Sequence, residues 1–361
     1  MTNQISDQTP HQVSSLAEFG WSNFFTSQLM SDELMGLTPA RVKSVHRNRL
    51  EVIGVGFDQM VPPFSPNEGE LTPVTVGDWL LLDVETFRPL HLLERKSLVK
   101  RRAVGKAATE QLIAANIDTL FVVTSCNMDF NVARLERYLA LAHEAGVTPV
   151  LVLTKADLAE GGVEAYVGAA RDMERGLIVE VLDARDKDAV KCLEPWCSRG
   201  QTVAFVGSSG VGKSTLINSL KGGEEIATGA IREDDAKGRH TTTGRTLYRL
   251  PGGGWLVDTP GMRELQLSEV EAGIEEVFAD LVDLAAECRF SDCQHQTEPG
   301  CAVQAAIASG TLEETRYKRW EKLRAEDTRN TTTLAERRVQ GRKFDKMVKR
   351  AKKDKAHWRD D

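Results

Sequence analysis

Hydrophobic and polar positions change their spacing along this chain, and the changes predict distinct successive parts. Residues 1–35 are mostly polar and form a loosely ordered arm, although Trp21, Phe24 and Phe25 indicate one short segment that docks on the rest. From 36 to 103, short β-rich runs are separated by Pro, Gly and Asn. This pattern is typical of a small β-barrel.

Residues 104–275 alternate between apolar runs and amphipathic segments, which is the pattern of an α/β domain. Several runs are nearly continuous in Val, Leu and Ile, and this favours a parallel sheet that is buried on both faces. The expected strands include IDTLFVVTS, TPVLVLT, LIVEVL, QTVAFVG, TLYRL and GWLVD. The expected helices include ARLERYLALAHEAG and KSTLINSL. Residues 276–330 are helical around a Cys/His cluster, and 331–361 form a basic tail.

Composition narrows the class of protein. With 361 residues, 41% hydrophobic and 27% charged, the chain can bury sizeable cores, so wholesale disorder and collagen-like structure are excluded. No apolar run approaches the ~18 residues that a membrane span needs, and the N-terminus has no apolar core of the secretory type. We therefore expect a cytoplasmic protein of two or three domains that does not enter a membrane.

The net charge of −7 is unevenly distributed. Residues 316–361 carry 17 Lys and Arg against 8 Asp and Glu, so a basic tail follows an acidic body. Such a tail favours contact with a nucleic-acid backbone, because neutralised phosphates release counterions. The alternative is a solvated helix face with ion pairs along it.

A phosphate-binding pattern, G-x-x-x-x-G-K-[ST], lies between an expected strand and an expected helix. It comprises Gly207, Ser208, Ser209, Gly210, Val211, Gly212, Lys213 and Ser214, with Thr215 next in the chain. The glycines let the backbone N–H groups and the helix N-terminus face the phosphates. Lys213 would reach the β- and γ-phosphate oxygens and the Ser214 hydroxyl would bind Mg²⁺. The context predicts a nucleoside triphosphate site.

Selection of the base is indicated by the four residues that follow the strand PVLVL. Thr154, Lys155, Ala156 and Asp157 resemble the [NT]-K-x-D element of GTPases. There the carboxylate accepts two hydrogen bonds from guanine, and the lysine stem lies over the base. Adenine would leave that carboxylate unpaired, so Asp157 predicts GTP and disfavours an ATP-using kinase.

The γ-phosphate-sensing loop is expected after the strand GWLVD. Asp258 to Gly261 match D-x-x-G, in which Asp258 holds Mg²⁺ through its water shell and the Gly261 N–H senses the γ-phosphate. The polar segment 238–244 has the character of a mobile loop that closes on the nucleotide. We expect Thr242, with Thr241 second, to bind Mg²⁺.

Many GTPases place a Gln directly after D-x-x-G to orient the attacking water, but this chain has Met262 there. A thioether cannot orient water, so turnover must be slow until another group supplies this function. His240 is our hypothesis for the catalytic water-positioning residue, because it lies in the expected mobile loop and an imidazole can accept or donate a hydrogen bond near neutral pH. The alternative is a histidine that is solvated or contacts a partner.

The order of these elements is permuted. The guanine-type element at 154 precedes the phosphate loop at 207, which precedes Asp258, so the chain leaves the domain directly after the phosphate-sensing loop. Whatever follows is then coupled to the nucleotide state. The fifth element, usually Ser-Ala, has no clean match, and Asp183-Ala184 occupies its place.

A Cys/His cluster follows the core. Cys288, Cys293, His295 and Cys301 supply three thiolates and one imidazole, the ligand set of a single structural Zn²⁺ site with no open position. In a cytosolic protein these cysteines are not expected to form disulfides. The other cysteines are expected to pack in the core: Cys126, Cys192 and Cys197.

Taken together, these motifs resemble those of the RsgA (YjeQ) family of circularly permuted GTPases. The resemblance covers about residues 35–330 and includes GDW at 77–79, GSSGVGKST, GRHTTTGRT and CRFSDCQHQTEPGC. It implies an N-terminal OB-fold, a permuted GTPase domain and a C-terminal zinc domain. It also implies contact with 16S rRNA and a low GTPase activity that the 30S ribosomal subunit stimulates. The first 35 residues and the basic tail lie outside the shared pattern.

We therefore predict a Mg²⁺-dependent, monomeric GTP hydrolase that acts in late 30S maturation, binds rRNA with GTP and is released on hydrolysis. One rival is an RNA-binding assembly factor that binds GTP but barely hydrolyses it. Another is a GTPase of the large subunit or of a tRNA pathway. The barrel residues alone also allow an SH3-like fold. Two exposed basic sites are candidate RNA contacts or plain solvated surface: Arg41/Lys43/Arg47/Arg49 and Lys96/Lys100/Arg101/Arg102.

Overall fold

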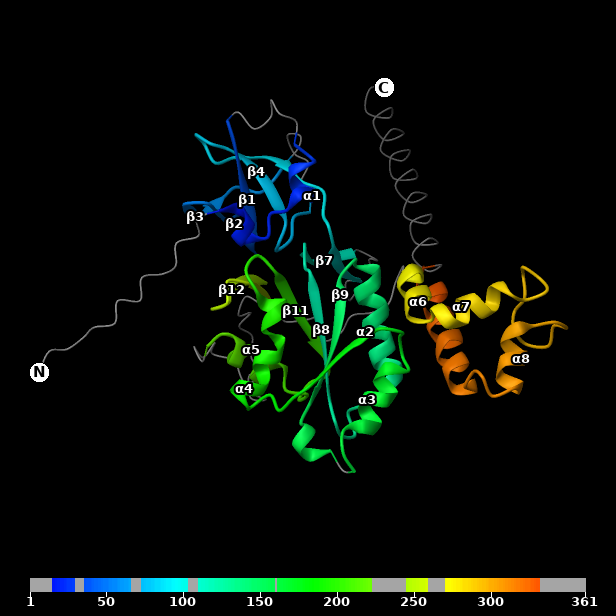
Figure 1. The fold of residues 1–361 in the computed structure, drawn as a ribbon. Coiled ribbons are helices and arrows are strands. Elements are labelled where there is room, and N and C mark those ends of the chain that lie inside the picture. The colour runs from blue at the N-terminus through cyan, green and yellow to red at the C-terminus, as the bar shows by residue number, and fades with distance from the viewer. Residues whose placement is uncertain are drawn as a thin grey trace, which may run out of the picture.

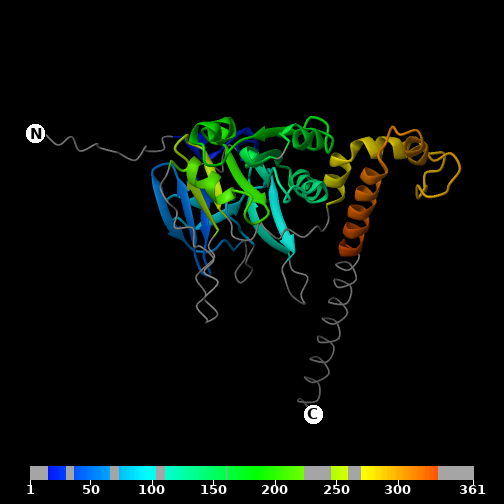
Figure 2. The ribbon, with the colours of Figure 1, turned by 90° about the horizontal axis from the view of Figure 1, so that it is seen from below.

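The computed structural model describes residues 15–29, 36–65, 73–102, 110–159, 161–222, 245–258 and 270–331. A central sheet layered by helices forms the core (Figure 1). Strands from the N-terminal part extend this sheet at one end, and helices from the C-terminal part lie at the opposite end, as both views show (Figures 1 and 2). Among the helices of these ranges, none combines the length and apolarity needed to cross a bilayer.

Five parallel strands make the core sheet, in the spatial order β10-β9-β8-β11-β13. Their bounds are β8 Thr119–Ser125, β9 Thr148–Thr154, β10 Ile178–Val181, β11 Thr202–Gly207 and β13 Trp255–Asp258. Antiparallel β12 (Thr246–Arg249) follows β13 at the edge. Every residue of β8 and of β11 is buried. The parallel sheet predicted from the continuous apolar runs is confirmed.

Helices cover both faces of this sheet because alternate strand residues point to opposite sides. Leu120 and Val122 pack in one cluster with α2, whereas Phe121 and Val123 pack in another with α5. The bounds on the first side are α2 Val132–Glu144 and α3 Glu164–Arg171. Those on the second side are α4 Lys187–Val190, η3 Lys191–Cys197 and α5 Lys213–Leu220.

The N-terminal strands pair antiparallel in the order β3-β2-β1-β4-β5. Their bounds are β1 Leu37–Val45, β2 Leu50–Gly54, β3 Phe57–Val61, β4 Trp79–Asp83 and β5 Pro89–Leu92. β1 also pairs with β12 at Ser44 and Thr246, so these strands and the core form one sheet of eleven described strands. This continuity across the two parts was not predicted.

The segment 15–29 docks between these two parts. It contains η1 (Leu16–Phe19) and α1 (Asn23–Thr26), and Phe25 within it is 1% exposed. The ring centroid of Phe25 lies 5.7 Å from that of Trp79 in β4, and Phe19 stacks on Trp255 of β13 at 5.6 Å. The docking segment predicted from its aromatic residues is therefore present.

One sequence interpretation needs correction, because Arg41 was a candidate exposed RNA contact, but it is 1% exposed and hydrogen-bonds inside the molecule. The structure also contains an antiparallel pair that is absent from the expected strands: β6 (Leu98–Arg102) and β7 (Glu110–Ala115). Residues Lys100 to Arg102 are all basic, so this part of β6 lacks the alternation of apolar and polar residues that indicates a strand.

The C-terminal part consists of short helices and the Cys/His loop. Their bounds are α6 Glu271–Val277, α7 Ala279–Ala286 and α8 Ala302–Ala308, followed by a helix of residues 314–331. α6 packs against α2 of the core. A Cβ atom on Gly273 of α6 would lie 2.0 Å from the Ala140 carbonyl oxygen, so only glycine allows this close approach.

Candidate nucleotide and metal sites

The phosphate loop connects the buried strand β11 to α5. A Cβ atom on Gly207 would lie 2.1 Å from the Val123 carbonyl oxygen, and its φ of 144° is unfavourable for other residues, so the turn requires glycine. Lys213 Nζ donates to the Gly207 carbonyl at 2.8 Å and also to the Ser208 carbonyl. The ammonium group thus lies against the loop, within reach of an anion at the N-terminus of α5.

The guanine-type element is tied directly to this loop. Thr154 ends β9, and its hydroxyl contacts the Val211 carbonyl at 2.6 Å and the Thr124 carbonyl at 3.1 Å. Lys155 follows with φ of 54°, a left-handed conformation that is strained for lysine, and Asp157 lies in η2 (Ala156–Leu158). The structure therefore brings residues 154–157 to the same sheet edge as residues 207–215.

The loop after β10 completes this edge. Ala184 is buried, and its carbonyl accepts a 3.4 Å hydrogen bond from Ser219 of α5. Arg185 donates from Nη2 to Asp157 Oδ2 at 2.7 Å and to Asp183 Oδ2 at 2.9 Å. Hydrogen bonds from Arg185 lower the pKa of Asp183, and the pKa of Arg185 is raised by the same hydrogen bonds.

Sequence reasoning missed two arginines at this edge. Arg185 lies directly after the expected fifth element, and this position is the one feature of the sequence that could have indicated a role for it. Arg134, in the first turn of α2, donates from Nη1 to the Ser208 hydroxyl of the phosphate loop. Nothing in the local pattern of α2 marks Arg134, because the contact joins segments 74 residues apart.

Asp258 lies at the carboxyl end of β13, the strand next to β11, where Ala204 pairs with Val257. This places it on the sheet edge that also carries Ser214 at the start of α5. The predicted roles of His240, Thr242 and Gly261 concern positions outside the described residues, as do Thr241 and Met262.

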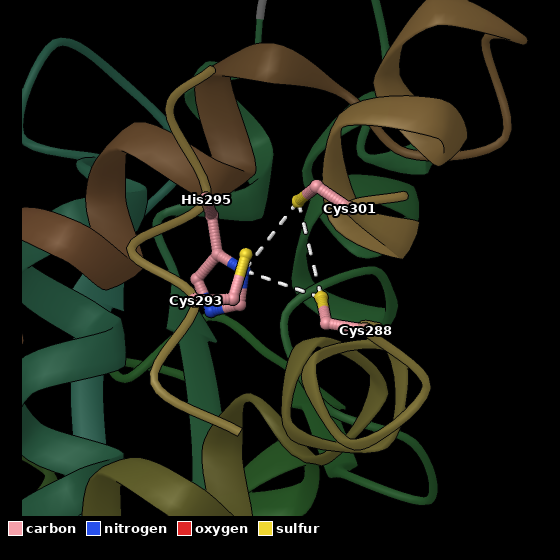
Figure 3. Close-up of side chains that lie close together, drawn as sticks. All are labelled: Cys288, Cys293, His295 and Cys301. Carbon is pink, nitrogen blue, oxygen red and sulfur yellow. Dashed lines mark hydrogen bonds between the residues drawn. The ribbon is translucent and has the colours of Figure 1, made fainter. Parts of the chain in front are cut away.

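The four predicted metal ligands come together in the C-terminal part (Figure 3). Their ligand atoms all lie within 4.8 Å of one another. His295 Nδ1 is 3.5 Å from Cys288 Sγ and 3.6 Å from Cys301 Sγ, and these two sulfurs are 3.9 Å apart. Zn–S bonds of about 2.3 Å in a tetrahedron give ligand separations of about 3.8 Å, so the arrangement fits zinc.

Neighbouring groups hold these ligands in place. Gln304 Nε2 donates to the His295 carbonyl at 2.6 Å, and the Gln304 backbone N–H donates to Cys301 Sγ at 3.4 Å. Burial, together with the nearby Arg324, lowers the pKa of His295. The imidazole is therefore favoured in its neutral form, which is the form that binds metal.

The remaining cysteines behave differently. Cys126 and Cys197 are buried and Cys192 is half-buried, as expected for core packing. Burial raises the pKa of the Cys192 thiol to about 11 and that of Cys197 to about 12. Among the described residues, none of these three belongs to a group of His, Cys, Asp and Glu side chains that could hold a metal ion.

Comparisons with known proteins agree with this geometry. A family model described as RsgA GTPase matches residues 92–268. Over 357 residues the chain is 48% identical to the small ribosomal subunit biogenesis GTPase RsgA 2 of Vibrio parahaemolyticus, covering 98% of this chain and 97% of that protein. The chain belongs to the RsgA GTPase family.

Two solved structures share the RsgA-type fold. YjeQ from Thermotoga maritima is 25% identical, with a TM-score of 0.60 over 80% of this chain and 97% of that one. YloQ, named as a circularly permuted GTPase, has a TM-score of 0.58 at 23% identity over 83% of this chain and 96% of that one. The permuted order predicted from the motifs is therefore confirmed at the level of the fold.

Proposed function

We propose that this RsgA-family protein is a GTP hydrolase that acts late in maturation of the 30S ribosomal subunit. It binds rRNA in its GTP state and leaves on hydrolysis. The observation that carries this proposal is the convergence of the guanine-type element and the phosphate loop, joined by the 2.6 Å contact between Thr154 and Val211. The related RsgA 2 protein, a small ribosomal subunit biogenesis GTPase, supports the choice of pathway.

In this proposal each residue at the sheet edge has one task. Asp157 accepts hydrogen bonds from guanine, and the Lys155 stem covers the base. The backbone N–H groups of residues 207–215 bind the phosphates, and Lys213 moves from the loop carbonyls to the phosphate oxygens. Oxygen ligands suit Mg²⁺, and Ser214, Asp258 and Thr242 would hold the ion. The ion would neutralise charge on the phosphates.

Water attack requires a positioning group, and His240 is the proposed one. Because Met262 cannot position the attacking water, intrinsic GTP hydrolysis is slow until the 30S subunit helps to position that water. A His240→Ala protein should bind GTP normally but lose most 30S-stimulated hydrolysis. Full stimulated hydrolysis in this variant would exclude the histidine from the reaction.

The Cys3His cluster is proposed to hold one structural zinc ion. Metal analysis of the purified protein should give one zinc per chain, and Cys288→Ser should reduce it while Cys192→Ser, outside the cluster, should not. A strong chelator should unfold the C-terminal part, because the binding energy of a structural zinc is folding energy. Zinc content that is unchanged in Cys288→Ser would contradict this assignment.

The proposed setting is a cytoplasmic monomer on RNA. The barrel and the basic tail would contact 16S rRNA, and the exposed Arg47 and Arg49 on the β1–β2 turn remain available for this. Phosphate contacts make such binding weaken steeply with salt. The domain limits at 35, 103, 275 and 330 are part of the same proposal.

The decisive experiment measures phosphate release from GTP and from ATP, alone and with salt-washed 30S or 50S subunits. We expect a large stimulation only with GTP and 30S. Stimulation by 50S would favour a large-subunit GTPase. Tight GTP binding without stimulation by either particle would favour the RNA-binding factor with a regulatory nucleotide site. Lys213→Ala is the control that should abolish turnover in every case.

A further inference from the structure

The carboxylate proposed to read guanine is already engaged by an arginine. Arg185 Nη2 lies 2.7 Å from Asp157 Oδ2. The same guanidinium donates two hydrogen bonds to Asp183, from Nη2 to Oδ2 at 2.9 Å and from Nε to Oδ1 at 3.1 Å. The backbone N–H of Arg185 also donates to Asp183 Oδ1 at 3.0 Å. Asp183 therefore holds Arg185 at the mouth of the base site.

A guanidinium group presents hydrogen-bond donors much as guanine does. Guanine offers a carboxylate two parallel N–H groups, one on the ring and one on the exocyclic amine. Arginine offers neighbouring N–H groups in a planar array of similar width. Arg185 Nη2 already occupies one acceptor position of Asp157 Oδ2. The two donors of guanine therefore meet a carboxylate that is partly engaged by a competing cation.

The exchange has a low cost because Arg185 keeps another partner. Nη2 contacts both carboxylates, so a move of the Asp157 side chain breaks its contact with Arg185 while the contacts from Nε and Nη2 to Asp183 stay in place. The Arg185 side chain is 68% exposed and that of Asp157 is 38% exposed, so the ion pair between them is weak. Such a contact competes with a ligand but does not block it.

We propose that Arg185 is an internal competitor for the guanine base, held by Asp183 and paired with Asp157 until guanine displaces it. This rests on the proposed role of Asp157 in GTP binding. The competition lowers the affinity for GDP and GTP and slows their association. It also keeps the Asp157 carboxylate paired while the site is empty.

The test is stopped-flow binding of a fluorescent GDP derivative to the full chain. Removing this exposed ion pair should raise the association rate and affinity of Arg185→Ala for GDP about two- to fivefold, with little change in the dissociation rate. The GDP association rate and affinity of Arg185→Lys should lie between those of the unsubstituted protein and Arg185→Ala, since lysine keeps the charge but lacks the planar array of donors. The difference should shrink in ~1 M salt, which screens exposed pairs.

The matched control is Arg175→Ala, which removes the same charge from an exposed position on the loop before β10 and should leave GDP binding unchanged. Weaker GDP binding with faster dissociation in Arg185→Ala would show that the arginine supports the bound base, and would overturn the competitor role. Unchanged association and affinity would overturn it too. Failure of the unsubstituted protein to bind GDP would instead refute the proposed function, and the inference with it.

Discussion

The core is joined to its two neighbours in different ways. The barrel joint consists of segment 15–29, Arg41 and the strands around Trp79 and Trp255. The zinc joint consists of α2 packed on α6 and on the helix of residues 314–331. The first is built mainly from aromatic rings and hydrogen bonds to backbone groups, with ion pairs from Glu18 to Arg199 and Arg249. The second combines apolar packing with buried ion pairs over a close helix crossing.

At the barrel joint, buried hydrogen bonds and aromatic packing connect the two parts. Trp255 Nε1 donates to the Glu18 carbonyl at 2.7 Å. Arg41 Nη2 donates to the Asn116 carbonyl at 3.0 Å and the Thr202 hydroxyl at 2.9 Å. Opening this joint would expose large aromatic surfaces and strand edges, so it should act as a rigid connection.

The zinc joint combines apolar packing with several ion pairs. Glu136 of α2 is fully buried and accepts from Arg319 Nε at 2.9 Å, with Arg316 at 3.5 Å. Arg137 pairs with Glu326 at 2.6 Å. These charges can exchange their partners for water at modest cost, unlike aromatic surface.

One helix of the core reaches both the zinc joint and the phosphate loop. The helix α2 that carries Glu136 also carries Arg134, which contacts Ser208 of the phosphate loop. We therefore expect a rigid barrel joint and an adjustable zinc joint, with α2 linking the zinc joint to the phosphate loop.

The largest effect is expected at the barrel joint. Phe25→Ala should destabilise the protein by about 4 kcal/mol, because a fully buried ring leaves a cavity. Urea unfolding followed by tryptophan fluorescence measures this. The control is the adjacent Phe24→Ala, since Phe24 is 39% exposed and should cost less than about 1 kcal/mol. Equal costs for the two would mean that segment 15–29 is not docked.

The buried arginine of the same joint should give the next largest effect. Burial lowers the pKa of Arg41 to about 10, which still leaves it charged at neutral pH. Arg41→Met keeps apolar volume but strands its carbonyl and hydroxyl acceptors, at a cost of about 3 kcal/mol. Arg47→Met, on the exposed turn, is the control and should be neutral. A neutral Arg41→Met would show that the joint does not depend on these hydrogen bonds.

A smaller and pH-dependent effect is expected at the zinc joint. Burial, opposed by Arg319 and Arg316, raises the pKa of Glu136 above 4.5. A raised pKa stabilises the fold at low pH, and this contribution is lost as the pH rises through the folded value. Glu136→Gln is neutral throughout, so its stability relative to that of the unsubstituted protein should increase as the pH rises from about 5 to about 7.5. At the upper pH the substitution should lower the free energy of unfolding by less than about 1 kcal/mol.

Urea titrations of both proteins at the two pH values measure this difference. A loss of about 3 kcal/mol or more in Glu136→Gln at the upper pH would show that the buried ion pair strongly stabilises the joint. The two joints would then be equally rigid.

The smallest effect is expected from salt alone. Raising salt to about 1 M should increase amide hydrogen exchange in α6 and residues 314–331, because their partly exposed ion pairs are screened. Exchange in segment 15–29 should not increase. Equal protection of both joints at low and high salt would contradict the distinction between them.

Much of the chemistry and the core fold followed from local sequence. The apolar runs predicted the parallel strands, and the spacing of Cys288, Cys293, His295 and Cys301 predicted a cluster that the structure brings together. Such signals are local because strand alternation, loop glycines and closely spaced ligands act over a few residues. The RsgA resemblance followed from the order of these local motifs.

Only the tertiary structure decided which charged residues lie inside and how the parts connect. Arg41 meets Thr202 across 161 residues, and Glu136 meets Arg319 across 183. In sequence each is an ordinary charged residue within an amphipathic or β-rich segment. The partners that make their burial tolerable come from distant segments, so local patterns carry no trace of them. Arg185 belongs to the same class, since its contact with Asp157 exists only where the ends of β9 and β10 meet.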